Sequence, residues 1–248
     1  MAGRVHEEAA RGFARSADAY ERARPEYPAE AVAWLAERTG LRPGRTVVDL
    51  AAGTGKLTRP LAATGARVIA VEPVPEMRAR IGPEAARVLD GTAEAIPVPD
   101  ADADLVAVGQ AFHWFDGPAA LAEIHRVLRP GGSLALVWNR RPPDDPVHAA
   151  IDAIIGPYRG DTPAHSSGAW RAAFEATALF GPLEQRTFGH AQRMDAGALA
   201  DRVGSTSFVA ALPDAPRAEV LEAVRELAAD GPVALPYVCE VLVCDRRP

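Results

Sequence analysis

Residues 47–58 of this 248-residue chain, VVDLAAGTGKLT, constrain its fold more than any other segment. The β-branched run TVVDL (46–50) carries an acid, Asp49, near its end and passes at once into small residues and glycines. Small residues let a backbone come close to a ligand, and the start of a following helix offers unpaired N–H groups. The segment therefore predicts a strand, a tight glycine turn and a helix start that together bind a ligand at the end of the strand.

Three ligand classes use such a loop, and the neighbouring residues separate them. A P-loop for phosphates is excluded, because Leu50 and Leu57 stand where it needs a glycine and a serine or threonine. A dinucleotide fingerprint is weakened but stays open, because Thr58 stands in place of its third glycine. The third class is a nucleoside cofactor that carries an ammonium instead of a pyrophosphate. The Asp49 carboxylate would attract that ammonium and repel a pyrophosphate.

Glu72, at the end of the next predicted strand, adds to this pattern. A carboxylate at that position accepts hydrogen bonds from both ribose hydroxyls of a bound nucleoside. Sites for dinucleotides and for other nucleoside cofactors share the feature, so it does not separate the two. The alternative is that Asp49 and Glu72 are solvated carboxylates at the ends of strands.

Strand-like and helix-like segments alternate up to Trp138. PAEAVAWLAER (28–38) repeats apolar residues at helical spacing, and Gly40 suits the position just past a helix end. PAALAEIHRVL (118–128) shows the same spacing, and RPGG (129–132) breaks it. The apolar, strand-like segments are 46–50, 67–72, 87–91, 103–110 and 133–138. This alternation predicts a parallel sheet that is covered on both faces.

The sequence changes character after Trp138. NRRPPDDP (139–146) is a polar, proline-rich break. The segments that follow suggest helices with loops over 147–180, a strand over 183–194, helices over 195–204 and 214–229, and an alternating closing strand over 237–246. We therefore expect an α/β fold, a Rossmann-like, doubly wound, mostly parallel seven-stranded sheet with an antiparallel closing strand and a helical cap insertion.

The expected organisation is a single domain of residues 1–248. It comprises N-terminal lid helices (1–40), a cofactor-binding core (41–138), helical cap elements (139–182 and 195–232) and closing strands (183–194 and 234–246). Trp138, Trp170, Phe174 and Phe180 suit the apolar core better than a site.

The composition of the chain argues against several classes of binding partner. The formal net charge of −6 and the absence of a basic cluster argue against nucleic acid. No apolar run reaches the 18 or more residues of a membrane span, and the N-terminus lacks the apolar stretch of a secretory signal. The two cysteines, Cys239 and Cys244, fall on opposite faces of one predicted strand and have no metal-ligand spacing. We expect a cytoplasmic protein without a metal, acting on a small molecule.

Four motifs in order resemble those of the class I S-adenosylmethionine-dependent methyltransferases. They are DLAAGTG (49–55), with Ala51 in place of the first glycine of the family motif, VEPVPEM (71–77), GTAEAIPVPDADADLV (91–106) and HRVLRPGG (125–132). The resemblance covers roughly residues 40–140. Two flanking segments, AYERARPEYP (19–28) and DRVGSTSF (201–208), resemble a subgroup that includes trans-aconitate methyltransferases and natural-product enzymes.

The resemblance implies S-adenosylmethionine as cofactor and S-adenosylhomocysteine as product, and it implies binding roles for particular residues. The methionine end would be held by Asp49, Ala51, Gly53 and Gly55 and flanked by Gln110 and Ala111. The ribose would be held by Glu72. The adenine would be contacted by Pro73, Met77, Thr92, Ala93 and Glu94. Thr92 departs from the family, because most members have aspartate there.

His113 is the candidate catalytic residue. It lies in AFHWFD (111–116), which follows the fourth predicted strand at the edge of the sheet where ligands bind in open α/β folds. A histidine there can act as a general base, because its pKa lies near neutrality. The alternative is that His113 only packs or caps the next helix. Tyr20 is a second catalytic candidate. Substrate contacts are expected from Tyr20, Arg24, Tyr27, His113, Trp114, Arg202 and Phe208.

The expected function is methyl transfer to a small molecule, with a preference for an electron-rich aromatic acceptor such as a phenol or an indole. The preference rests on aromatic residues expected to face the pocket, namely Tyr20, Tyr27, Phe112, Trp114 and Phe208. A polyanionic acceptor would need several converging arginines, and only Arg24 and Arg202 stand out. Three alternatives stay open: methylation of a small carboxylate such as trans-aconitate, an NAD-dependent dehydrogenase, and a non-catalytic sensor of S-adenosylmethionine.

Overall fold

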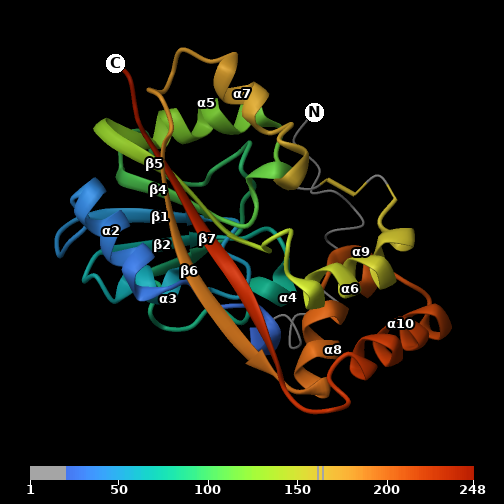
Figure 1. The fold of residues 1–248 in the computed structure, drawn as a ribbon. Coiled ribbons are helices and arrows are strands. Elements are labelled where there is room, and N and C mark those ends of the chain that lie inside the picture. The colour runs from blue at the N-terminus through green and yellow to red at the C-terminus, as the bar shows by residue number, and fades with distance from the viewer. Residues whose placement is uncertain (1–20, 161, 164) are drawn as a thin grey trace.

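The computed structural model describes residues 21–160, 162, 163 and 165–248, and the strands among them form one seven-stranded sheet (Figure 1). In chain order the strands are β1 (Thr46–Leu50), β2 (Arg67–Val71), β3 (Arg87–Leu89), β4 (Ala103–Gly109), β5 (Leu128–Arg140), β6 (Glu184–Met194) and β7 (Val233–Asp245).

The order of the strands across the sheet is β3-β2-β1-β4-β5-β7-β6. Strands β1 to β5 pair in parallel, whereas β7 runs antiparallel to both of its neighbours, β5 and β6. The expected fold class, a Rossmann-like and mostly parallel sheet with an antiparallel closing strand, is confirmed.

Helices cover both faces of the sheet, as the apolar strands require. Helices α2 (Ala29–Thr39) and α3 (Thr58–Ala62) lie on one face, where Leu35 and Leu61 join a buried apolar cluster. Helix α5 (Gly117–Val127) lies on the other face, where Leu121 and Ile124 are fully buried, and α7 (Arg171–Glu175) packs beside it. Helix α2 ends at Gly40, whose φ of 66° is the left-handed conformation that glycine adopts readily.

The RPGG segment differs from expectation. It does not separate α5 from the next strand, because β5 already begins at Leu128. The register of β5 against β4 shifts here, so that Ala103 pairs with Leu128 and Leu105 pairs with Ser133. The extra residues form a bulge, and Arg129 Nη1 lies 3.1 Å from Asp104 Oδ2 opposite it. The glycines therefore bend a continuous strand.

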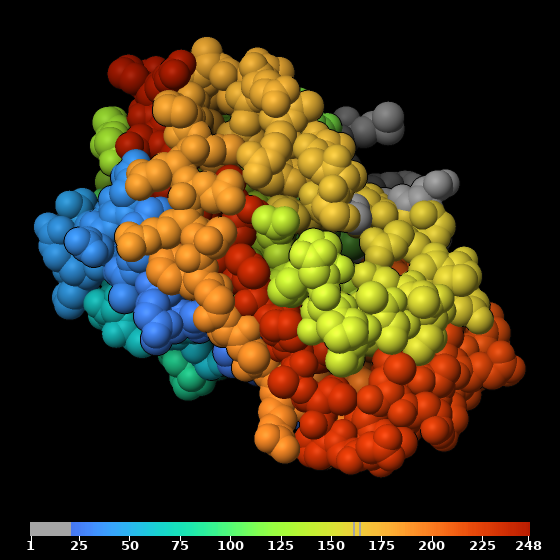
Figure 2. All heavy atoms as spheres, viewed as in Figure 1, coloured from blue at the N-terminus to red at the C-terminus, as the bar shows by residue number. Residues whose placement is uncertain are grey.

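A third apolar cluster lies beyond one end of the sheet, in a cap made of residues 141–160 and 195–232. Its helices are α6 (Pro146–Ile155), α8 (Ala196–Gly204), α9 (Ser207–Ala210) and α10 (Asp214–Glu226). Ile151, Leu199 and Val224 are buried together in this cluster, separate from the two faces of the sheet. Figure 2 shows the cap as a bulky mass on one side of the molecule, in yellow and red.

The two cysteines lie on opposite faces of β7, as expected. Cys239 is buried on the face covered by α2, Cys244 is buried on the face covered by α5, and both thiols are free. Among the described residues, no helix combines the length and the apolarity that crossing a membrane requires.

Candidate functional site

The candidate site begins where β1 and β4 end side by side. The chain leaves β1 toward β2 on one side, and β4 lies on the other side, so ligands are expected in the crevice at this edge. Ala51 and Gln110, which follow the two strands, have φ angles of 55° and 60°. Left-handed backbone is uncommon for residues other than glycine, and it is enriched at functional sites.

The glycine loop connects β1 to α3. Gly53 and Gly55 have φ angles of 58° and 85°, which explains the glycines at these positions. Helix α3 begins only at Thr58, so the loop is longer than a direct strand-to-helix turn. The Thr58 hydroxyl donates a hydrogen bond of 2.6 Å to Asp49 Oδ2 and thereby ties the helix start to the strand end.

Asp49 is a fully buried carboxyl group with spare bonding capacity. Its Oδ1 atom has no hydrogen-bond partner within the described part of the chain. Burial raises the pKa of Asp49 to about 7, and the hydrogen bond from Thr58 opposes that rise. A buried carboxylate without a full set of partners is costly. The position would gain stability from a cationic donor.

Glu72 holds the glycine loop against the strand next to it. Its Oε2 atom accepts a 2.9 Å hydrogen bond from the Gly53 N–H, and its Oε1 atom accepts a 2.8 Å bond from the Val74 N–H. The side chain is buried, and burial raises the pKa of this carboxyl. Each carboxylate oxygen can accept a second hydrogen bond, so Glu72 keeps the capacity to bind hydroxyl groups.

A narrow cavity of about 50 Å³ opens between the ends of β1 and β4. Lys56, the only lysine of the chain, lines it and lies 2.5 Å from Glu26 Oε1. Tyr27 lies against Gly109, where an added Cβ atom would come within 2.6 Å of the tyrosine hydroxyl. The predicted residues that line this cavity are Arg24, Tyr27, Asp49, Ala51, Gly53, Gln110 and Arg202.

The residues predicted to contact adenine lie outside this cavity. Met77 is buried on the short helix α4 (Pro75–Arg78), and Pro73 precedes that helix. Thr92 pairs with Ala95 in an isolated bridge, and Ala93 between them is buried. Glu94 Oε1 accepts a 3.0 Å hydrogen bond from the Asp116 N–H.

A second cavity, of about 690 Å³, lies between the end of the sheet and the cap. Trp138 on β5 and Trp170 before α7 line it, although both side chains are also nearly fully buried. They therefore belong to the core, as expected, and also form an aromatic wall. The residues shared by the two cavities are Arg24, Gln110, Asn139 and Arg202. The two spaces are thus neighbours.

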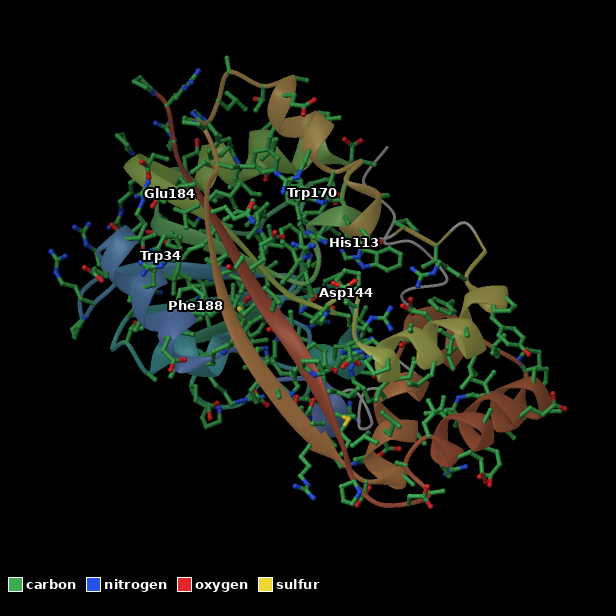
Figure 3. All side chains as sticks on the ribbon, viewed as in Figure 1. Trp34, His113, Asp144, Trp170, Glu184 and Phe188 are labelled. Atoms are coloured by element: carbon green, nitrogen blue, oxygen red, sulfur yellow. The ribbon has the colours of Figure 1, made fainter. Side chains whose placement is uncertain are left out.

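His113 lies on the 3₁₀ helix η1 (Phe112–Trp114) and lines the larger cavity. Its Nδ1 atom is buried and lacks a partner among the described residues. Burial and the nearby charge of His165 lower the pKa of His113 to about 4. In the view of Figure 3, His113 appears between Trp170 and Asp144, on the cap side of the sheet.

The larger cavity also holds a half-buried histidine beside a buried glutamate, a pair not expected from the sequence. Glu240 on β7 is buried, and its Oε1 atom accepts hydrogen bonds from Arg140 and Gln185. Its Oε2 atom lies 3.1 Å from Nε2 of His165, an ion-pair distance without hydrogen-bond alignment. The signal that could have revealed Glu240 is a lone acid inside the apolar strand YVCEVLVC.

The predicted substrate residues are only partly brought together. Trp114, Arg202 and Phe208 line the larger cavity, and the Arg24 guanidinium is held by Ser205, through Oγ at 3.1 Å and the carbonyl at 2.8 Å. Phe112 lines neither of the two cavities described above. It is buried in the core, 5.1 Å from the ring of Phe174, because η1 turns it toward α7. Tyr20 lies outside the described residues.

Comparisons with known proteins agree with this architecture. Residues 48–136 match the family described as "Methyltransferase domain". An uncharacterized methyltransferase of Mycobacterium tuberculosis is 39% identical over 245 residues, with 94% of each chain covered. An uncharacterized methyltransferase-like protein of Schizosaccharomyces pombe is 36% identical, covering 84% of this chain and 82% of its own. A solved structure of a putative type II methyltransferase from Anaeromyxobacter dehalogenans has a TM-score of 0.62 at 27% identity, covering 90% of this chain and 96% of its own.

Proposed function

The chain belongs to the class I S-adenosylmethionine-dependent methyltransferases, and we propose that it methylates a small molecule held in the larger cavity. The observation that carries the proposal is the buried Asp49 carboxylate at the crevice, whose Oδ1 atom lacks a partner in the described part of the chain. The fold of the family implies the use of S-adenosylmethionine. When bound, this cofactor supplies a methyl group that its sulfonium centre has already activated.

The residues at the crevice fit the two ends of such a cofactor. Asp49 can accept a charge-assisted hydrogen bond from the ammonium of the methionine end. Glu72 can accept bonds from the ribose hydroxyls while it keeps the Gly53 and Val74 N–H groups. The proposed set is completed by backbone around Ala51 and Gly55, by Gln110 and Ala111 beside the methionine end, and by Pro73, Met77, Thr92, Ala93 and Glu94 around the adenine.

The narrow cavity is lined by residues proposed for the methionine end, Asp49, Ala51 and Gly53 among them, and by none of those proposed for the adenine. The nucleoside would extend over Glu72 and α4, outside that cavity. The residues shared with the larger cavity then mark where the methyl group and the acceptor meet, beside Gln110 and Asn139.

The aromatic wall of the larger cavity favours an acceptor with a planar part. The rings of Trp138 and Trp170 are 4.9 Å apart, and Trp114 lines the same space. Flat electron-rich molecules stack well on such side chains. Holding acceptor and methyl group in near-attack geometry, with water excluded, is the main contribution the protein can make, on the order of 7–11 kcal/mol for ideal positioning.

His113 is the proposed proton acceptor where the acceptor loses a proton. Its pKa of about 4 keeps the imidazole neutral at physiological pH, so a lone pair is available in the cavity. A base of such low pKa is weak, however, and catalysis is most efficient near the working pH. His165, which lines the same cavity with its Nε2 atom 3.1 Å from Glu240 Oε2, is the second candidate for this role.

The test is a transfer assay with S-adenosylmethionine labelled at the methyl group. The purified protein is incubated with separate pools of phenols, indoles, aromatic acids and non-aromatic carboxylates, and label is followed into the organic products. The proposal predicts acceptor-dependent formation of S-adenosylhomocysteine with one of the aromatic pools. Turnover of non-aromatic carboxylates alone would contradict the planar acceptor. Binding of S-adenosylhomocysteine without turnover of any pool would contradict small-molecule methylation.

A further inference from the structure

The larger cavity is more cationic than the sequence analysis expected. Among the described residues that line it are two acids and six arginines. The acids are Asp152 and Glu240, and the arginines are Arg24, Arg140, Arg141, Arg159, Arg171 and Arg202. The expectation that only Arg24 and Arg202 converge on the pocket is therefore wrong. The other four come from the end of β5 (Arg140), the loop after it (Arg141), the cap (Arg159) and the start of α7 (Arg171), which meet only in the folded chain.

Three of these arginines have contacts that occupy them. Arg140 Nη1 donates a 2.9 Å hydrogen bond to Glu240 Oε1. Arg24 is bonded to Ser205 through two of its nitrogens. The Arg171 guanidinium lies over the ring of Trp170, 4.5 Å from its centroid. These contacts hold the three guanidinium groups at the wall of the cavity.

The other three, Arg141, Arg159 and Arg202, form what we call the arginine cluster. Arg141 Nη2 lies 2.8 Å from Asp152 Oδ1, and Arg159 Nη2 lies 3.9 Å from the same oxygen. Arg202 Nε donates a 3.1 Å hydrogen bond to the Tyr237 hydroxyl. The three arginines and Asp152, all of which line the cavity, carry a formal net charge of +2.

The cluster is partly removed from water, so its charges are not simply screened. Burial lowers the pKa of Arg141, and the positive charges of Arg202 and Arg159 lower it further. Like charges brought together in a half-buried place are unfavourable unless an anion joins them. Guanidinium groups present planar pairs of N–H donors that match an oxyanion such as a carboxylate or a phosphate.

We propose that Arg141, Arg159 and Arg202 bind an oxyanion group, a carboxylate or a phosphate, on the methyl acceptor. The inference rests on the proposed function, because it takes the larger cavity as the acceptor site. The Phe208 ring lies 5.5 Å from the Arg159 guanidinium and continues the apolar wall beside the cluster. The acceptor is therefore a planar molecule with an acidic group. This replaces the uncharged phenol or indole as the favoured class.

The test is a binding experiment that needs no turnover. Matched probes are titrated into the protein by calorimetry, with and without S-adenosylhomocysteine: indole-3-acetate against its amide, and phenyl phosphate against phenol. We expect each acid to bind about tenfold or more tightly than its neutral partner, as hydrogen bonds to charged groups imply. The acid that shows the larger gain in affinity over its own neutral partner identifies whether the bound anion is a carboxylate or a phosphate.

Arg159→Gln is the decisive variant, because this side chain is partly exposed and its loss should not prevent folding. It should remove most of the preference for acids and leave S-adenosylhomocysteine binding unchanged. Arg42→Gln is the control, because Arg42 is exposed and contacts the Gly40 carbonyl at the far end of α2. Equal affinity for acids and neutral partners, with normal S-adenosylhomocysteine binding, would overturn the proposed role of the arginine cluster and leave the proposed function intact. Acid binding without any S-adenosylhomocysteine binding would support the cluster and overturn the proposed function.

Discussion

Thr58 donates a 2.6 Å hydrogen bond to one carboxylate oxygen of Asp49, while the other oxygen, Oδ1, has no partner among the described residues. The contact fixes the carboxyl group at the junction of β1 and α3 and leaves Oδ1 able to accept a hydrogen bond from a ligand. Burial raises the pKa of this group to about 7, so its ionisation is coupled to whatever binds there. The first two predictions follow from this coupling.

Cofactor affinity should depend on pH through Asp49. The ammonium of S-adenosylhomocysteine favours the ionised carboxylate, so affinity should fall as pH drops below about 7, by up to about tenfold per pH unit. Calorimetry at pH 7 in buffers of different ionisation enthalpy should show release of about half a proton per ligand. Asp49→Asn should bind weakly at every pH and release no proton. A wild-type affinity that is constant from pH 5 to pH 8 would contradict the assignment.

The same shift has the opposite consequence for the free protein. The Asp49 carboxyl ionises near 3.8 in the unfolded chain and near 7 in the folded chain. Its contribution to stability is therefore fully present below about pH 4 and is lost as pH rises through 7. Asp49→Asn should raise the melting temperature relative to wild type at pH 8 and change it little at pH 4. A variant that is less stable than wild type at pH 8 would show that the buried charge has an unrecognised partner.

Glu72→Ala should weaken S-adenosylhomocysteine binding by about tenfold to a hundredfold, because charge-assisted bonds to the ribose are lost. The variant also leaves the Gly53 and Val74 N–H groups without their acceptor, so Glu72→Gln is needed beside it. Glu219→Ala, at an exposed position on α10, is the control. Calorimetry measures all three. Unchanged affinity for S-adenosylhomocysteine in a folded Glu72→Ala protein would contradict the assignment of Glu72 to the ribose.

His113→Ala should lower kcat by a factor on the order of 100 or more with a responsive acceptor, and leave S-adenosylhomocysteine affinity unchanged. Because the pKa of His113 is about 4, wild-type kcat should be level from pH 8 down to about pH 5 and fall only near pH 4. Wild-type kcat in the variant would mean that His113 only packs. If His165→Ala then loses activity, the base is assigned to His165 instead.

Activity should survive chelation of metals. Among the described residues, no group of three or more His, Cys, Asp and Glu side chains is placed to hold a metal ion. An activated methyl group also needs no Lewis acid for transfer. We therefore expect the same rate before and after dialysis against EDTA. Complete loss of activity that a divalent ion restores would contradict this prediction.

The sequence predicts the sheet well because local pattern and tertiary structure agree there. TVVDL becomes β1 and is buried at every position, as expected for a strand covered on both faces. The start of β5 was misjudged, because RPGG reads as a break when its pairing partner is unknown. Only the opposite strand, with Asp104 facing Arg129, makes it a bulge.

The candidate site likewise has one part that the sequence predicts and one part that it does not. The proposed cofactor residues lie at the ends of neighbouring strands, so their order in the sequence already places them at one edge. The larger cavity is assembled from the sheet and the cap, which are separate segments of the chain. Nothing in the sequence indicates that Arg141 lies beside Asp152 and near the positive charges of Arg159 and Arg202. The cap geometry alone reveals that cluster.

The crevice beside Asp49 and Glu72 is the proposed site of an S-adenosylmethionine-type ligand. It is tested by titration calorimetry of the wild-type protein with S-adenosylhomocysteine and, separately, with NAD. We expect saturable binding of one S-adenosylhomocysteine per chain and no binding of NAD, because the Asp49 carboxylate repels its pyrophosphate. Binding of NAD without binding of S-adenosylhomocysteine, or binding of neither ligand, would contradict the proposed site.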